Sequence, residues 1–245
     1  IITVEKSDEA GIFLTCSESR LPTDEKNIAY KAAQAFFEFT KLEGGANISI
    51  TKRIPMAAGL GGGSADAAAV ILALDKLYKT ELKTEELEKI AIGLGADVPF
   101  FITGGTKRAE GIGDILTDIK TLPKGYFLLV KDGEKLSTAE MYKKLDESGY
   151  DKYNVQNLIS AIEKENQNEM CMSFGNSFEK LWESAPIKTE LLKLGADAVC
   201  LSGSGPTFFA FYKNKRDAKK AYARLKIQNK ECFLTKPLKK AIFFV

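Results

Sequence analysis

A run of glycines ahead of an alanine-rich segment constrains this chain most. The stretch RIPMAAGLGGGSADAAAVILALDKLY, Arg53 to Tyr78, places four glycines between Gly59 and Gly63. Glycine weakens regular structure by up to about 1 kcal/mol relative to alanine, so such a cluster indicates a tight turn or a ligand that approaches the main chain. After the loop, apolar residues recur at helical spacing and predict one buried helix face: Ala67, Val70, Ile71, Leu74 and Leu77.

A loop of this kind, leading directly into a helix, predicts an anion site. The free N–H groups and the positive end of the helix dipole point at one small volume, and phosphate is its natural occupant. We expect Ser64, at the helix start, either to cap the helix or to offer its hydroxyl to a phosphate oxygen or a phosphate-bound magnesium ion. The stretch fits neither GxxxxGK[ST] nor the dinucleotide pattern GxGxxG. From these residues alone, a plain turn is an equal alternative.

Composition indicates a soluble globular protein with a small-molecule partner. With 245 residues, of which 44% are hydrophobic, the chain is long enough for one large or two small domains. Basic residues number 35 against 33 acidic ones, without long runs of either sign, so we predict neither a nucleic-acid nor a membrane partner. Four scattered cysteines and no histidine exclude zinc fingers and most catalytic zinc sites, and they fit reduced thiols in a cytosol.

The periodicity of the chain predicts mixed α and β structure in two layers. Before a soft boundary near Lys120 we expect strands at 1–5, 11–16 and 46–55, and helices at 28–41, from Ser64 to Tyr78, and from Thr84, as N-cap, to Gly95. After the boundary we expect a strand within 120–130, helices near 139–146, 155–165 and 174–184, two strands around a glycine turn within 196–212, a helix at 216–226, and a last strand at 241–245.

Three ordered motifs resemble those of the GHMP kinases. PMAAGLGGGSADAA is similar to their phosphate loop, GADVPFF (95–101) to the segment that carries their catalytic aspartate, and LSGSGPTFFA (201–210) to their C-terminal glycine loop. PTDEKNIAYKAA (22–33) and STAEMY (137–142) further resemble members that act on a cytidine diphosphate substrate in the non-mevalonate isoprenoid pathway. The similarity extends over nearly the whole chain.

The resemblance implies an α+β, two-domain GHMP kinase fold. Residues 1–120 would form an N-terminal, ribosomal-protein-S5-like α/β domain that binds ATP. Residues 121–245 would form a C-terminal, ferredoxin-like α/β sandwich that binds the substrate. The implied activity is phosphorylation of a hydroxyl on a small-molecule cytidine diphosphate substrate in the cytoplasm, with ATP as co-substrate and Mg²⁺.

The same resemblance assigns roles to individual residues. Asp97 would be catalytic, accepting or orienting the proton of the attacking hydroxyl, and Ser64 would reach magnesium through the phosphates. Asn27 and Lys52 would lie near the adenine. The ATP phosphates would be held by Pro55, Met56, Ala57, Ala58, Gly59, Leu60, Gly61, Gly62, Gly63, Ser64 and Ala65. Substrate would be bound by Thr138, Tyr142, Gly203, Ser204 and Gly205.

Each of these residues also has a structural interpretation. Asp97 follows a helix end and fits a turn. From spacing alone, Tyr142 fits the inward face of an amphipathic helix better than a ring that stacks on cytosine. Gly203 to Gly205 fit a tight hairpin. Cys200, beside that turn, fits a packed strand residue better than a reactive thiol.

The sequence departs from the family pattern at its front. The AKINL-like strand, with a lysine that assists the aspartate, and the GYH-like stretch do not occur, and IITVE already alternates as a strand. We therefore expect that this opening hairpin precedes the sequence given. Lys107 and Arg108 lie within reach of Asp97 in sequence. Alternatives are another GHMP kinase, the related decarboxylase, or a nucleotide-binding module without turnover.

Overall fold

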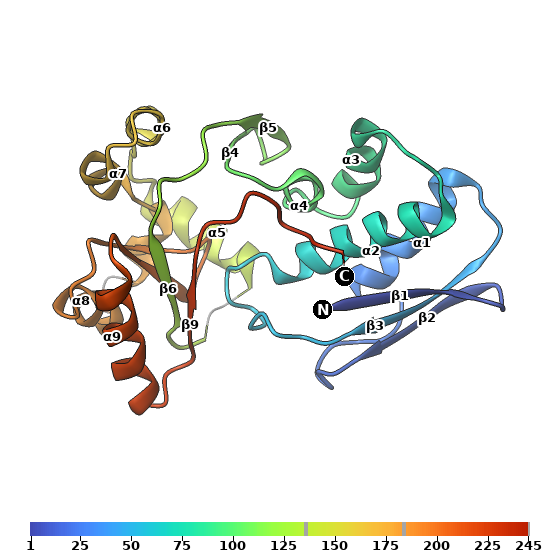
Figure 1. Cartoon of the computed structure of the whole chain (residues 1–245), viewed down its shortest axis with the longest axis horizontal. Coiled ribbons are helices and arrows are strands. Elements are labelled where there is room, and N and C mark those ends of the chain that lie inside the picture. Colours follow the sequence, from blue (N-terminus) through green and yellow to red (C-terminus); the bar gives the residue numbers. More distant parts are fainter. Residues whose placement is uncertain (135–136, 183–184, 245) are drawn as a thin grey trace. The chain divides into compact units, whose positions relative to one another are not determined.

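The computed structural model describes residues 1–134, 137–182 and 185–244, and it confirms the expected α+β class (Figure 1). The chain divides into two compact units. Unit 1 comprises residues 1–54, 61–118 and the segment from Lys239 onward, and unit 2 comprises residues 55–60 and 119–238. That ATP binding belongs to residues 1–120 and substrate binding to residues 121–245 stays a prediction.

Unit 1 is built on a small mixed sheet. Strand β3 (Gly45–Ile50) lies in its centre, antiparallel to β1 (Ile2–Ser7) and parallel to β2 (Gly11–Cys16). Helices α1 (Ile28–Thr40) and α2 (Gly62–Tyr78) pack against each other and against this sheet. Two short helices, α3 (Thr84–Ile92) and α4 (Val98–Thr103), pack on α2, and β4 (Lys107–Glu110) pairs with β5 (Ile115–Asp118).

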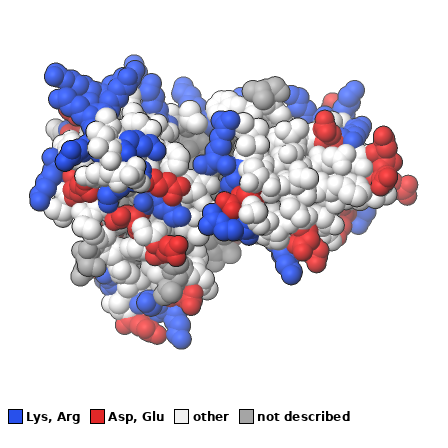
Figure 2. Space-filling model, turned by 90° about the horizontal axis from the view of Figure 1, so that it is seen from below, with Lys and Arg blue, Asp and Glu red and all other residues white. Residues whose placement is uncertain are grey.

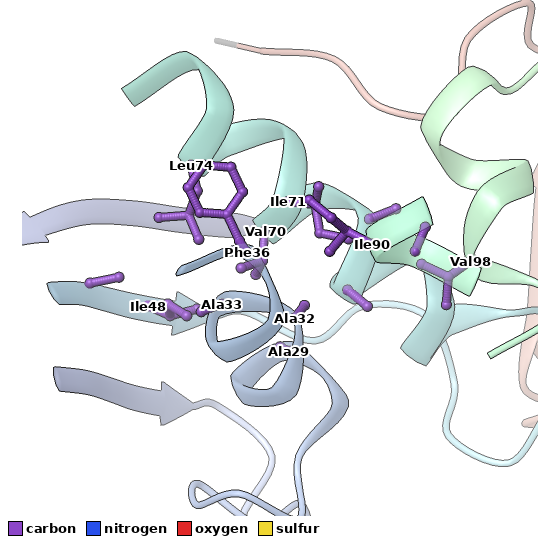
Figure 3. Close-up of a cluster of buried hydrophobic side chains, with 14 of the residues drawn as sticks. Ala29, Ala32, Ala33, Phe36, Ile48, Val70, Ile71, Leu74, Ile90 and Val98 are labelled. Atoms are coloured by element: carbon purple, nitrogen blue, oxygen red, sulfur yellow. The ribbon is translucent and has the colours of Figure 1, made fainter. Parts of the chain in front are cut away.

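The core of unit 1 follows from one periodic stripe on α1. Ala29, Ala32, Ala33 and Phe36 are spaced as a single helix face, and none of the four is exposed to solvent. Three alanines let α2 approach closely, and Figure 3 shows Phe36 beside Val70 and Leu74 of α2. The predicted inward residues of α2 are thus confirmed from Ala67 to Leu74, whereas Leu77 is only partly buried.

Unit 2 has the β–α–β–β–α–β order of a ferredoxin-like sandwich. Its antiparallel sheet runs in the order β7 (Ala198–Leu201), β8 (Thr207–Tyr212), β6 (Tyr126–Lys131) and β9 (Cys232–Thr235). The helical segments are α5 (Thr138–Ser148), α6 (Val155–Glu163), α7 (Gln167–Ser173), the 3₁₀ helix η1 (Ser177–Trp182), α8 (Pro186–Lys193) and α9 (Lys215–Ile227).

The expected strand at 241–245 is wrong over residues 241–244, and Val245 lies outside the described residues. Ala241 to Phe244 form no strand, and CFLT at Cys232–Thr235 completes the sheet instead by pairing with β6. The apolar run AIFF resembles a strand locally, but Phe243 and Phe244 are at least half exposed, and Lys76 places its ammonium 4.4 Å from the ring centre of Phe244. Whether a short apolar run becomes a strand depends on a partner strand that the sequence does not reveal.

Two expected helix boundaries are also corrected. The helix expected near 174–184 is a 3₁₀ helix at Ser177–Trp182, and Glu183 and Ser184 lie outside the described residues. Thr84 is the first residue of α3 and not its N-cap. Lys83 holds the N-cap position, and its N–H donates to the Glu86 carboxylate at 2.9 Å. Glu86, the third residue of α3, thereby satisfies a main-chain amide that would otherwise be unpaired at the helix start.

The surface carries charges of both signs. On the face seen in Figure 2, Lys and Arg gather at the upper left and mix with Asp and Glu elsewhere. Among the described residues, no helix is long and apolar enough to span a membrane. That neither nucleic acid nor a membrane is a partner stays a prediction.

We expect Phe36→Ala to lower the free energy of unfolding by about 3 to 5 kcal/mol, because it removes a fully buried ring and leaves a cavity. Urea denaturation followed by circular dichroism measures this. Phe39→Ala is the matched control on the same helix, since Phe39 is 42% exposed and its loss should cost far less. Equal losses for the two variants would contradict the assigned core.

Candidate active site

The N-cap residue of α2 has no side chain that could cap the helix. Gly61 holds this position with φ of +62°, and within the described residues the helix start shows no side-chain cap hydrogen bond. Ser64 lies inside the helix as its third residue, so the expectation that it caps α2 is wrong. Gly61 is required on two grounds, because its φ is left-handed and a Cβ there would lie 2.7 Å from Phe101 Cζ. The loop therefore presents uncapped amides at a helix N-terminus, which is the arrangement that binds phosphate.

Lys52 and Asp66 form an ion pair beside this helix start. The Lys52 ammonium contacts the Asp66 carboxylate, and only 9% and 15% of the two side chains are exposed. A Cβ on Gly62 would lie 3.2 Å from Lys52 Nζ and 3.1 Å from Ile54 Cγ2. The pair thus joins the chain that leaves β3 to the first turns of α2, and it passes directly next to a glycine of the loop.

The first half of the glycine loop packs on the C-terminal glycine turn. The Ser202 hydroxyl donates to the carbonyl oxygen of Gly59 at 2.8 Å. A Cβ on Gly59 would lie 2.3 Å from the Ser202 carbonyl oxygen and 2.9 Å from that of Gly205. The two main chains therefore touch directly, and only glycine fits at position 59. The turn is also the hairpin between β7 and β8, which confirms the structural interpretation of Gly203 to Gly205, whereas their role in binding stays a prediction.

Asp97 lies between two helices, exposed to solvent. It follows α3 and holds the N-cap position of α4, but its carboxylate makes no capping hydrogen bond. Within the described part of the chain it has no ion pair. Lys107 and Arg108, the basic residues nearest after it in sequence, are paired locally with Asp118 at 2.5 Å and Glu110 at 2.7 Å. The Asp97 carboxylate is thus chemically available, and its catalytic role stays a prediction.

The Asn27 side chain stabilises the start of α1. It caps α1 by accepting from the N–H of Ala29 at 2.9 Å, and its amide nitrogen donates to the carbonyl oxygen of Pro22 at 2.7 Å. The side chain is 7% exposed. Its proposed place near the adenine stays untested, as does that of Lys52.

The predicted substrate residues lie on unit 2. The hydroxyl oxygens of Thr138, at the start of α5, and Ser204, in the glycine turn, are 3.5 Å apart. Tyr142, one turn further along α5, is 50% exposed and packs edge-on against Phe178 with ring centres 4.9 Å apart. The inward residues of α5 are Met141 and Leu145, so Tyr142 is not simply part of the packed face.

Cys200 is a packed strand residue, as expected. It is 3% exposed in β7, and burial, with the Glu179 carboxylate nearby, raises the pKa of its thiol far above the usual range. A thiol held protonated in this way is a poor nucleophile.

Sequence reasoning missed Asp66 and Ser202. Asp66 falls within the quoted glycine motif, but its partner lies 14 residues earlier in the chain. Ser202 falls within the third motif, and its partner Gly59 lies 143 residues away. Local spacing in the sequence indicates neither contact, because each joins residues from different elements of the fold.

Both halves of the chain match one protein family. The pattern of the GHMP kinases N terminal domain matches residues 27–105, and that of the GHMP kinases C terminal domain matches residues 156–231.

Curated relatives and solved structures agree. The chain is 38% identical to a 4-diphosphocytidyl-2-C-methyl-D-erythritol kinase of Clostridium perfringens (strain SM101 / Type A), over 92% of this chain and 81% of that protein. It is 38% identical to the protein of the same name from Clostridium botulinum (strain Kyoto / Type A2), over 95% and 85%. A crystal structure of a 4-(cytidine 5'-diphospho)-2C-methyl-D-erythritol kinase superposes with a TM-score of 0.80 at 30% identity, covering 96% of this chain and 85% of that one.

We expect Lys52→Met to lower the free energy of unfolding by about 2 kcal/mol, somewhat below the roughly 3 to 5 kcal/mol typical when one partner of a fully buried pair is removed. The loss arises because Asp66 keeps a poorly solvated charge. The double variant Lys52→Met with Asp66→Leu should recover most of it, since an apolar pair of similar volume is often neutral. Urea denaturation compares the three proteins. A single variant as stable as the parent would show that the pair contributes nothing.

Proposed function

Because this chain belongs to the GHMP kinases, we propose that it phosphorylates the 2-hydroxyl of 4-diphosphocytidyl-2-C-methyl-D-erythritol with ATP, in the non-mevalonate isoprenoid pathway. The identity of the substrate is supported by relatives that are 38% identical over more than nine tenths of the chain. The choice of ATP as phosphoryl donor is supported by the match of both parts of the chain to the GHMP kinase domains.

The observation that carries the chemistry is the uncapped start of α2 behind the glycine loop. The loop Pro55 to Ala65 would hold the ATP phosphates, with the free main-chain N–H groups in the first turn of α2 as donors, because the N-cap Gly61 has no side chain that competes for them. Pro55 has no N–H, and that of Ala65 donates to the Gly61 carbonyl oxygen at 2.9 Å, so these two would contribute to the shape of the loop. Positioning and charge stabilisation supply most of the catalysis in phosphoryl transfer. Main-chain N–H groups whose positions are fixed by the start of α2 meet that need.

Asp97 is proposed to act on the attacking hydroxyl. As the substrate oxygen bonds to the γ-phosphorus, the bond to the β-phosphate oxygen breaks and ADP leaves, while the hydroxyl proton passes to the Asp97 carboxylate. The carboxylate is exposed and unused by the helix cap, so it is free to accept that proton.

Magnesium fits this site as an ion carried by ATP. In the described residues no three acidic, histidine or cysteine side chains gather as a metal cage. Phosphate-bound Mg²⁺ usually keeps several waters and few protein ligands, and the Ser64 hydroxyl in the first turn of α2 is the proposed protein ligand. The ion would neutralise charge on the phosphate oxygens.

The substrate end is proposed to lie on unit 2, at Thr138, Tyr142 and the turn Gly203–Ser204–Gly205. The 3.5 Å approach of the Thr138 and Ser204 hydroxyls supports a shared polar site, and the half-exposed ring of Tyr142 is suited to stacking on cytosine. A cytoplasmic location stays our proposal, supported by four cysteines that form no disulfide.

An assay of ADP release with ATP, Mg²⁺ and the cytidine substrate tests the proposal, with phosphorus NMR to place the new phosphate. Homoserine and mevalonate are the comparison substrates. Preferential turnover of either would assign the chain to another branch of the family, and ATP binding without turnover would indicate a nucleotide-binding module.

We expect Asp97→Asn to lower kcat by about 10² to 10⁴, the usual contribution of positioned acid–base assistance, and to leave ATP affinity unchanged. Steady-state kinetics and calorimetric ATP titration measure the two quantities. Asp8→Asn, at another exposed aspartate in a bend, is the matched control and should change neither. A kcat within a factor of a few of the parent would leave Asp97 as a turn residue.

We expect Tyr142→Ala to raise the KM for the cytidine substrate by about 5- to 150-fold, the equivalent of one base–aromatic stack of roughly 1 to 3 kcal/mol. The KM for ATP should hardly change. Tyr142→Phe keeps the ring and should behave as the parent. Equal increases in both KM values would instead indicate that the contact with Phe178 serves packing.

A further inference from the structure

Asn176 lies outside all three family-like motifs, yet its side chain holds the C-terminal glycine turn. It sits just before η1, and its amide nitrogen donates to the carbonyl oxygens of Leu201 at 2.9 Å and Gly203 at 2.8 Å. Its amide oxygen accepts from the N–H of Phe178 at 2.9 Å. Two carbonyl acceptors on one side and one N–H donor on the other fix the orientation of the amide.

Glu179, within η1, also binds the main chain next to this turn. Its carboxylate accepts from the N–H of Leu201 at 2.9 Å and pairs with the Lys188 ammonium. Both main-chain groups of Leu201 are thus bound by side chains, the carbonyl oxygen by Asn176 before η1 and the N–H by Glu179 within it. This is the residue directly before Ser202, whose hydroxyl binds the Gly59 carbonyl oxygen.

The turn does not need these contacts in order to close. The N–H of Ser202 donates to the Thr207 carbonyl oxygen at 2.8 Å, and the N–H of Gly205 donates to the Ser202 carbonyl oxygen at 3.0 Å. These main-chain bonds already form the hairpin between β7 and β8. The bonds from Asn176 instead fix where the turn lies relative to η1, and therefore where Ser202 presents its hydroxyl.

We propose that Asn176 is a positioning residue for ATP binding, acting through the turn and the Ser202 hydroxyl on Gly59 of the phosphate loop. The inference rests on the proposed role of that loop in holding the ATP phosphates. Only an amide serves both purposes here, because it donates to two carbonyl oxygens and accepts from an N–H. A carboxylate of the same shape would set its oxygens against those of Leu201 and Gly203.

Asn176→Asp tests this directly. Loss of the two donated hydrogen bonds should weaken ATP binding about tenfold in a calorimetric titration, in line with the usual net contribution of such bonds. Asn154→Asp is the matched control. Asn154 caps α6 by accepting from the N–H of Asn157, which aspartate does equally well, so its ATP affinity should equal that of the parent.

Coupling to Ser202 separates positioning from general stability. Ser202→Ala should weaken ATP binding to a similar degree, Ser202→Thr should restore it by keeping the hydroxyl, and adding Asn176→Asp to Ser202→Ala should cause little further loss. A folded Asn176→Asp protein with parental ATP affinity, or fully additive losses in the double variant, would overturn the inference. If Asn176→Asp does not fold, parental ATP affinity in Ser202→Ala would overturn it alone.

The titration needs no phosphoryl acceptor. A parent protein that binds ATP but leaves the cytidine substrate unchanged would count against the proposed function and not against the role of Asn176.

Discussion

The candidate site depends on a contact between main chains at Gly59 and the turn Ser202–Gly205. No side chain fits between them, since a Cβ at position 59 would come within 2.3 Å of a carbonyl oxygen. The glycine at 59, with φ of +69°, is thus required by the fold itself. Residues 55–60, the first part of one glycine-rich motif, and the turn of another motif are thus parts of one packed arrangement within unit 2.

Local pattern was enough to predict much of the fold. The inward face of α2 and the alanine stripe of α1 are set by helical period, which a single sequence displays. The strands of the unit 2 sheet were harder to predict from the sequence. CFLT and AIFF are both short apolar runs, and only pairing with β6 makes the first a strand. Strand pairing joins residues far apart in the sequence, so composition and periodicity cannot show which of the two runs forms a strand.

The residue types of the candidate site stand out in the sequence, but their contacts do not. The sequence singles out the glycine loop, Asp97 and the third motif, whose roles stay predictions, and it does not reveal the contact that joins the loop to the turn at Ser202. Lys52 was expected near the adenine, and the structure pairs it with Asp66. Asn176 gave no signal at all, because a single asparagine in a loop is indistinguishable by sequence from the many that cap helices. Which polar side chains meet depends on the tertiary fold, so these contacts do not follow from the sequence pattern.

The route of the chain makes unit 2 an insertion. The polypeptide leaves unit 1 after Asp118 and returns to it at Lys239, and residues 55–60 make a second, shorter excursion. The returning segment packs its main chain near Gly104, where a Cβ would lie 2.6 Å from the amide nitrogen of Ala241. No single cut of the polypeptide therefore separates the two units into whole fragments. Unit 1 cannot be excised by truncation alone, and a gene split at the junction near residue 119 would leave the N-terminal fragment without a piece of its own packing.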